Sequence, residues 1–202
     1  GYFRMNKFEK VLRFIHDSID KSSEFYQKIY LVGGCVRDEM LGERFTDLDL
    51  LIDMPDGQKK FVEYMCQAFP DKCKGPFYYK RYGTTAMDVI IDKTLTLVEC
   101  VEPHIEQYNE EGTELIETHF CTLAEDAIRR DYTCNALYKN LHTGKVLDPC
   151  GKGIADLKNQ GFNEKGAEYV YKTIQNGEST ESEAEMSAAS DTSEGEGVAF
   201  PY

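Results

Sequence analysis

The sequence has 202 residues, 41% hydrophobic and 12% aromatic, so it can build one ordinary globular domain but hardly two. No apolar run reaches the length of a membrane span, no signal-peptide core is visible, and the seven cysteines form no CxxC pair. These features predict a cytoplasmic protein with reduced thiols and argue against a disulfide scaffold. The net charge of −13 argues against a general nucleic-acid binder, so any RNA contact should be local and assisted by metal ions.

The first expected element is a helix within an N-terminal helical segment, residues 1–28. Its apolar residues recur at helical spacing, which is typical of an amphipathic helix. We expect this helix to cover one face of a sheet. The apolar stripe consists of Phe8, Val11, Leu12, Ile15 and Ile19.

The next stretch is predicted to fold as strand, glycine turn, helix and strand. A short apolar run over residues 29–32 is followed by two glycines and then by a helix-compatible segment over residues 35–41. A second apolar run covers residues 48–52. Glycines between short apolar runs indicate a turn, and the rest of the chain is organised around this unit.

The polar residues of this unit have a pattern that suits nucleotide chemistry. Gly33 and Gly34 can adopt backbone angles that a Cβ forbids, so amide groups can converge on a phosphate, and Arg37 adds further donors. Asp47 and Asp49 are two residues apart in a predicted strand, so both carboxylates face the same way and can hold Mg²⁺. Alone, a Gly-Gly pair is usually a turn and an Asp-x-Asp is usually a solvated strand end. Together they predict a phosphate-binding metal site.

The chain then continues as a helix over residues 58–68 and a loop over residues 70–76. Residues 78–82 (YYKRY) are either an edge strand or a stacking platform for single-stranded RNA. Two strands are expected at residues 84–91 and 94–101, joined by a tight turn.

Glu99 lies on the second of these strands, on the same face as Leu95 and Leu97. A carboxylate on a strand next to the Asp-x-Asp strand would supply a third metal ligand. An ordinary edge glutamate explains the residue equally well.

Residues 102–118 are highly charged and are predicted to form a loop. After them, Thr122 and Glu125 have the spacing of a capping box. This pattern predicts a helix from residue 123 to residue 138.

Three polar residues of the predicted helix suit a nucleoside triphosphate. Asp131 and Asn135 are one turn apart, so a carboxylate and an amide face one spot, as ribose hydroxyls require. Arg130 beside them suits the triphosphate. By itself, such a cluster is more often a solvated helix face.

Two of these patterns resemble motifs of the tRNA nucleotidyltransferase (CCA-adding enzyme) and bacterial poly(A) polymerase family. They are Gly-Gly-x-Val-Arg-Asp at residues 33–38 followed by Asp-x-Asp at 47–49, and Arg-Arg-Asp-Tyr-Thr-x-Asn-Ala at 129–136. A third motif, at residues 144–157, resembles a structural hairpin of the family. The resemblance covers residues 29–157. It implies an α+β fold, the polymerase-β-like nucleotidyltransferase head, with a mixed sheet of about five strands and flanking helices over residues 29–160.

The resemblance also implies an activity and assigns roles to residues. The expected activity is metal-dependent, template-independent addition of nucleotides from ATP or CTP to an RNA 3′ end, either a tRNA CCA end or poly(A), with release of pyrophosphate. Catalysis would be done by Asp47 and Asp49, with Glu99 as a further ligand of Mg²⁺. The nucleotide would be bound by Gly33, Gly34, Arg37, Arg130, Asp131 and Asn135.

The chain departs from the family after residue 157. The family has a helical neck there, with a Glu-Asp-x-x-Arg segment that reads the incoming base, whereas this chain has no arginine beyond Arg130. We expect a short helical remnant at residues 161–176 and a disordered acidic tail at 177–202, which holds seven acids and no base. Alternatives are a neckless nucleotide-binding head that acts as a regulator or as half of a two-chain enzyme, whose partner supplies neck and tail, and an enzyme with a non-RNA acceptor.

Overall fold

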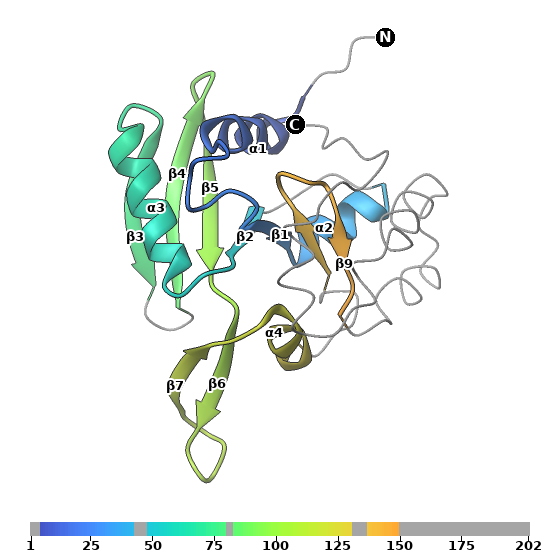
Figure 1. The fold of residues 1–202 in the computed structure, drawn as a ribbon. Coiled ribbons are helices and arrows are strands. Elements are labelled where there is room, and N and C mark those ends of the chain that lie inside the picture. Colours follow the sequence, from blue (N-terminus) through green and yellow to red (C-terminus); the bar gives the residue numbers. More distant parts are fainter. Residues whose placement is uncertain (1–4, 43–47, 80–82, 131–136, 150–202) are drawn as a thin grey trace.

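The structure is a computed structural model that describes residues 5–42, 48–79, 83–130 and 137–149. In this part of the chain a seven-stranded sheet has the order β3-β4-β5-β2-β1-β8-β9, and β6 and β7 form a separate two-stranded sheet (Figure 1). The helices are α1 (Lys7–Ser18), α2 (Gly34–Met40), α3 (Gly57–Ala68) and α4 (Leu123–Arg129). The strands are β1 (Ile29–Val32), β2 (Leu48–Ile52), β3 (Cys73–Tyr79), β4 (Thr84–Ile91), β5 (Thr94–Val101), β6 (His104–Tyr108), β7 (Leu115–Phe120), β8 (Tyr138–Asn140) and β9 (Val146–Leu147).

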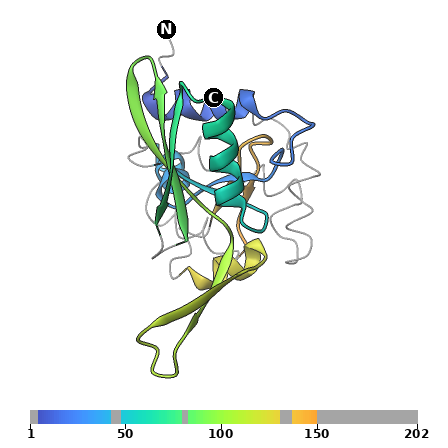
Figure 2. The ribbon, with the colours of Figure 1, turned by 90° about the vertical axis from the view of Figure 1, so that its left-hand side faces the viewer.

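Helices cover both faces of the large sheet. Ile29 and Leu31 of β1 belong to one buried cluster, to which α1 and α3 contribute their apolar stripes, while Tyr30 and Val32 belong to a second cluster with α4. This alternation follows from the two-residue period of a strand. Figure 2 shows α1 and α3 packed together on the large sheet and α4 at the base of the β6–β7 hairpin.

The predicted architecture is confirmed in its class and in most of its elements. The N-terminal helix, the unit over residues 29–52, the helix of α3 and the strands β4 and β5 lie where the pattern places them. Asp92 and Lys93 both have positive φ, as the tight turn of a two-residue hairpin requires. Among the described residues the sheet has seven strands rather than about five, because β8 and β9 extend it beyond β1.

The loop predicted over residues 70–76 is wrong in its second half. Strand β3 begins at Cys73 and pairs with β4, with a register shift between Lys74 and Phe77 that accommodates Gly75 and Pro76. A proline is tolerated here because β3 is the edge strand of the sheet. Tyr78 belongs to this edge strand, as one of the two interpretations of residues 78–82 predicted, while residues 80–82 lie outside the described residues.

The loop predicted over residues 102–118 is also wrong. The segment forms most of an antiparallel hairpin, β6–β7, which projects from the body of the molecule (Figures 1 and 2). The whole of β7 is exposed, so the strand buries no face and has no polar–apolar alternation that would identify it in the sequence.

The helix predicted over residues 123–138 begins where expected but is much shorter. Thr122 and Glu125 form both hydrogen bonds of the capping box. The helix ends at Arg129, since Arg130 has an extended backbone (ψ 123°), and Tyr138 begins strand β8. The start of the helix was therefore predicted correctly, and its predicted end at residue 138 is wrong, while residues 131–136 lie outside the described residues.

We expect Gly57→Ala to destabilise the protein by about 1–3 kcal/mol, the usual cost of overpacking. A Cβ at this first residue of α3 would lie 2.7 Å from the carbonyl oxygen of Ile52 and 2.8 Å from its Cβ. The helix would have to move away from β2. Urea unfolding measures the loss; Gln67→Ala, at an exposed position of the same helix, should be nearly neutral, and equal midpoints would contradict this packing.

His142 should make the fold sensitive to mild acid. Burial, then the neighbouring His16, lowers the pKa of His142 to about 4, and its ring accepts a hydrogen bond from the Gln27 amide while facing the Ile19 carbonyl. The unfolded chain therefore takes up a proton below about pH 6.5, so stability falls as the pH drops towards 4. Between pH 7 and pH 5 we expect this group to cost about 2 kcal/mol.

The variant His142→Gln should lose this pH dependence in urea unfolding at the two pH values. His119→Gln, at an exposed site on β7, is the matched control and should keep it. Equal slopes for the wild type and His142→Gln would contradict the assignment.

Candidate active site

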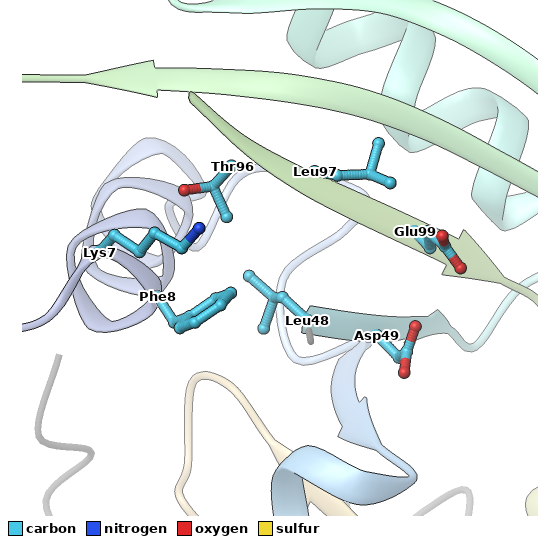
Figure 3. A pocket seen from close by; sticks show the side chains of 7 residues that line it. All are labelled: Lys7, Phe8, Leu48, Asp49, Thr96, Leu97 and Glu99. Atoms are coloured by element: carbon cyan, nitrogen blue, oxygen red, sulfur yellow. The ribbon is translucent and has the colours of Figure 1, made fainter. Parts of the chain in front are cut away.

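Two carboxylates lie side by side on neighbouring strands of the large sheet. Strands β2 and β5 are parallel, and their register pairs Asp49 with Glu99. Both side chains lie on the face opposite to Leu48 and Val98, which are buried in the cluster of α1 and α3. The predicted adjacency of these two strands is therefore confirmed. Figure 3 shows the two carboxylates close together, with Asp49 near the start of β2 and Glu99 near the end of β5.

The glycine turn after β1 lies beside this pair. Gly33 has φ +69°, and a Cβ built on it would lie 3.8 Å from Asp49 Oδ2, so the backbone passes close to the carboxylate. A Cβ on Gly34 would lie 3.2 Å from a terminal nitrogen of Arg37, which places this guanidinium against the turn. Cys35 stabilises the turn, because its buried thiol donates a hydrogen bond to the carbonyl of Val32 at 3.0 Å.

A cavity of about 210 Å³ borders the carboxylates and the turn. We call it the arginine cavity, because Arg129 and Arg130 are among its lining residues. Arginines and carboxylates that line one small cavity suit an anion that brings its own metal ions. The described residues that line it are Val32, Gly33, Asp49, Thr84, Glu99, Val101, His104, Glu106, Arg129 and Arg130.

A fully buried carboxylate, Asp126, holds both arginines in place. Its Oδ1 accepts from Arg129 at 3.0 Å and from the backbone amide of His104 at 3.1 Å. Its Oδ2 accepts from Arg130 Nε at 2.9 Å and from the Tyr138 hydroxyl at 2.6 Å. Asp126 therefore joins α4 to the base of the β6–β7 hairpin and to β8.

The electrostatics of this cluster favour the charged carboxylate. Burial alone would raise the pKa of Asp126, but Arg130, the Tyr138 hydroxyl and Arg129 outweigh it, and the pKa lies below its usual value. Burial and then Asp126 raise the pKa of Tyr138 well above its usual value. Asp126 thus stays an acceptor that orients Arg130, whose guanidinium also lies 5.8 Å from the centre of the Tyr138 ring.

The structure brings together four of the predicted site residues around the arginine cavity, namely Gly33, Asp49, Glu99 and Arg130. Gly34 and Arg37 lie next to them in the glycine turn. The remaining three predicted site residues, Asp47, Asp131 and Asn135, lie outside the described residues.

The sequence patterns missed Asp126, and Arg129 was noted only as part of a motif. A signal for both existed in the sequence, because an aspartate three and four residues before two arginines on a helix pairs with both. His104 and Glu106 were missed because they belong to a segment that was predicted to be a loop.

The residues present fit a hard divalent cation. Within the described ranges, no group of three or more histidine, cysteine or acidic side chains is placed to hold a metal ion. Two adjacent carboxylates facing an anion-binding cavity are nevertheless the set that Mg²⁺ uses when substrate phosphates complete its coordination. Asp49 and Glu99 are such a pair.

Comparison with known proteins agrees with this geometry. A family described as the poly A polymerase head domain matches residues 29–162. The chain belongs to this family. The matched range contains all seven strands of the large sheet and all the described residues that line the arginine cavity.

Several known proteins are similar to this chain. A mitochondrial CCA tRNA nucleotidyltransferase of Saccharomyces cerevisiae is 30% identical over 74% of this chain and 30% of its own length. Poly(A) polymerase I of Haemophilus influenzae is 30% identical over 64% of this chain and 28% of its own length. A CCA-adding enzyme structure (apo form II) aligns with a TM-score of 0.57 at 22% identity, over 77% of this chain and 34% of that one, which shows the shared fold. The chain thus spans less than a third of these two relatives.

The described helices include none that is both long and apolar enough to cross a membrane.

Proposed function

We propose that this chain is a nucleotidyltransferase head that transfers a nucleotide from ATP or CTP to the 3′ end of an RNA, with tRNA as the first candidate. The observation that carries the proposal is the pairing of Asp49 with Glu99 at the border of the arginine cavity. Carboxylates that can hold metal ions, with arginines in the same cavity, suit phosphoryl transfer. The relatives named as CCA tRNA nucleotidyltransferase and poly(A) polymerase support the same class of reaction.

In the proposed reaction, the oxygen of the acceptor 3′-hydroxyl attacks the α-phosphorus of the nucleoside triphosphate. The bond from this phosphorus to the bridging oxygen breaks, and pyrophosphate leaves with the bonding electrons. The hydroxyl proton passes to solvent past the carboxylate pair. Mg²⁺ bound there would lower the pKa of the hydroxyl and neutralise the triphosphate.

The residues of the chain act mainly by positioning and by charge. Asp49 and Glu99, together with Asp47, would hold Mg²⁺, and Arg130, which lines the same cavity, would contact the triphosphate. Gly33 and Gly34 allow the phosphates to approach the backbone, with Arg37 beside them. Asp131 and Asn135 would bind the ribose, which all four ribonucleotides share.

The proposed location is a reducing compartment such as the cytoplasm, because the cysteines that the structure describes are free thiols. Free thiols persist where disulfides are kept reduced. The described free cysteines are Cys35, Cys66, Cys73, Cys100 and Cys121.

The deciding experiment incubates the full chain with each labelled ribonucleoside triphosphate, Mg²⁺ and a tRNA that lacks its 3′ end. We expect extension of the RNA by one or more nucleotides, and none when EDTA replaces Mg²⁺. Nucleotide binding without extension of any RNA would instead favour a regulatory nucleotide-binding head. Absence of both would contradict the proposal.

A further inference from the structure

A second cavity, which we call the α1 cavity, borders the same carboxylate pair. Its volume is about 360 Å³, within the range of roughly 300–1,000 Å³ that is usual for small-ligand sites. Along β5, Thr96 and Leu97 before Glu99 line the α1 cavity, whereas Val101 after Glu99 lines the arginine cavity. The carboxylates therefore stand between the two cavities. The described residues that line the α1 cavity are Lys7, Phe8, Leu48, Asp49, Thr96, Leu97 and Glu99 (Figure 3).

The α1 cavity changes from acidic to apolar to basic along its length. Figure 3 shows the two carboxylates at one end, Leu48 in the middle, and Phe8 and Lys7 of α1 at the other end. The Lys7 ammonium lies 5.0 Å from the centre of the Phe8 ring. Among the described residues no carboxylate forms an ion pair with Lys7, whereas Lys10 on the next turn is paired with Asp92 at 2.8 Å.

A buried hydroxyl also lines this cavity. Thr96 is only 2% exposed, and within the described ranges its Oγ1 has no hydrogen-bond partner. Thr96 and Lys7 also line an adjoining cavity of about 140 Å³. A buried hydroxyl without a partner is costly, so a polar ligand atom that reaches it stabilises the complex.

These features assign an occupant, given the proposed function on which this step rests. In an in-line displacement, the attacking and leaving oxygens lie on opposite sides of the phosphorus. If the triphosphate occupies the arginine cavity, the attacking hydroxyl comes from the other side of Asp49 and Glu99, where the α1 cavity lies. We propose that the α1 cavity receives the 3′-terminal nucleotide of the acceptor RNA.

The chemistry of the cavity matches the parts of a nucleotide in order. The ribose with its 3′-hydroxyl lies at the carboxylates, and the base lies along the apolar wall of Phe8, Leu48 and Leu97. The backbone phosphate reaches the Lys7 ammonium, which acts as a flexible point charge. In a chain of net charge −13, a lysine that no described carboxylate neutralises would be a specific contact for RNA at this place.

The test measures KM for the acceptor separately from KM for the nucleotide, using the full chain and a tRNA that lacks its 3′ end. Lys7→Gln should raise the acceptor KM about three- to tenfold and leave the nucleotide KM within about twofold. Phe8→Leu, which keeps the apolar volume where Phe8 packs against the core, should raise the acceptor KM by a smaller factor. Fluorescence anisotropy of labelled RNA without nucleotide should show the same order of affinities.

Lys59→Gln is the matched control, because it removes the same charge from an exposed position on α3, whose residues do not appear among the described lining of the α1 cavity. It should leave both constants unchanged. If the wild type extends RNA while Lys7→Gln and Phe8→Leu keep the wild-type acceptor KM and RNA affinity, the inference is overturned and the proposed function stands. If the wild type extends no RNA, the proposed function fails and the inference fails with it.

Discussion

Replacing Asp49 by Asn should reduce nucleotide transfer by about a thousandfold or more while the protein remains folded. The substitution keeps the shape of the side chain but removes the negative charge that would hold Mg²⁺ next to Glu99. Because Asp49 is only partly buried and lies at the front of β2, its loss should leave the core intact. The measurement is single-turnover transfer in Mg²⁺, together with thermal unfolding of the same variant.

Asp71→Asn is the control, since it neutralises an exposed aspartate before β3, outside the described lining of both cavities. It should transfer nucleotide at the wild-type rate. Glu99→Gln should also reduce nucleotide transfer, because it removes the charge of the second carboxylate of the pair. The size of the loss would measure how much Glu99 contributes to metal binding. Wild-type turnover by Asp49→Asn would show that the metal assignment is wrong.

Replacing Asp126 by Ala should cost about 3–5 kcal/mol of stability, the range measured when one partner of a buried ion pair is removed. The side chain is fully buried and accepts from two arginines, the Tyr138 hydroxyl and the His104 amide. All four donors would lose their common acceptor. Urea unfolding measures the loss, and nucleotide affinity should fall as well, because Arg130 is no longer held at the arginine cavity.

The matched comparison is Asp92→Asn, which breaks the exposed ion pair with Lys10. It should cost far less than Asp126→Ala, because solvent screens an exposed ion pair. The variant Asp126→Asn keeps the volume and one acceptor oxygen, so its loss should lie between the two. If Asp126→Ala and Asp92→Asn have the same unfolding midpoint, the carboxylate does not organise the arginines.

The spacing of apolar residues predicted those elements that bury one face or both faces. The stripe of α1, the runs of β1 and β2 and the turn at Asp92 were all visible in the sequence because one face or both faces of each element are buried. The β6–β7 hairpin was invisible for the opposite reason, since it buries little. The end of α4 was not predicted, because Tyr138 belongs to β8, where its hydroxyl donates to Asp126. A tertiary contact of this kind leaves no pattern in the local sequence.

The same contrast between local sequence pattern and tertiary packing explains which site residues could be predicted. The two-residue period of a strand fixes the face on which Asp49 and Glu99 lie, whereas the pairing of β2 with β5, which brings them together, is seen only in the structure. Lys7 and Phe8 read only as the start of an amphipathic helix, because their place beside β5 depends on how that helix packs. The role of Asp126 likewise depends on three elements that meet only in the folded chain.

The parallel pairing of β2 with β5 also ties the site to the order in which the chain folds. The chain passes through α3, β3 and β4 before β5 returns alongside β2, so Asp49 and Glu99 meet only after a long loop has closed. A local opening that releases β4 and β5 would separate the carboxylates even if β1, α2 and β2 stayed together. Metal-dependent nucleotide binding should therefore disappear together with amide-exchange protection in β5, which makes it a probe of this sheet's cooperativity.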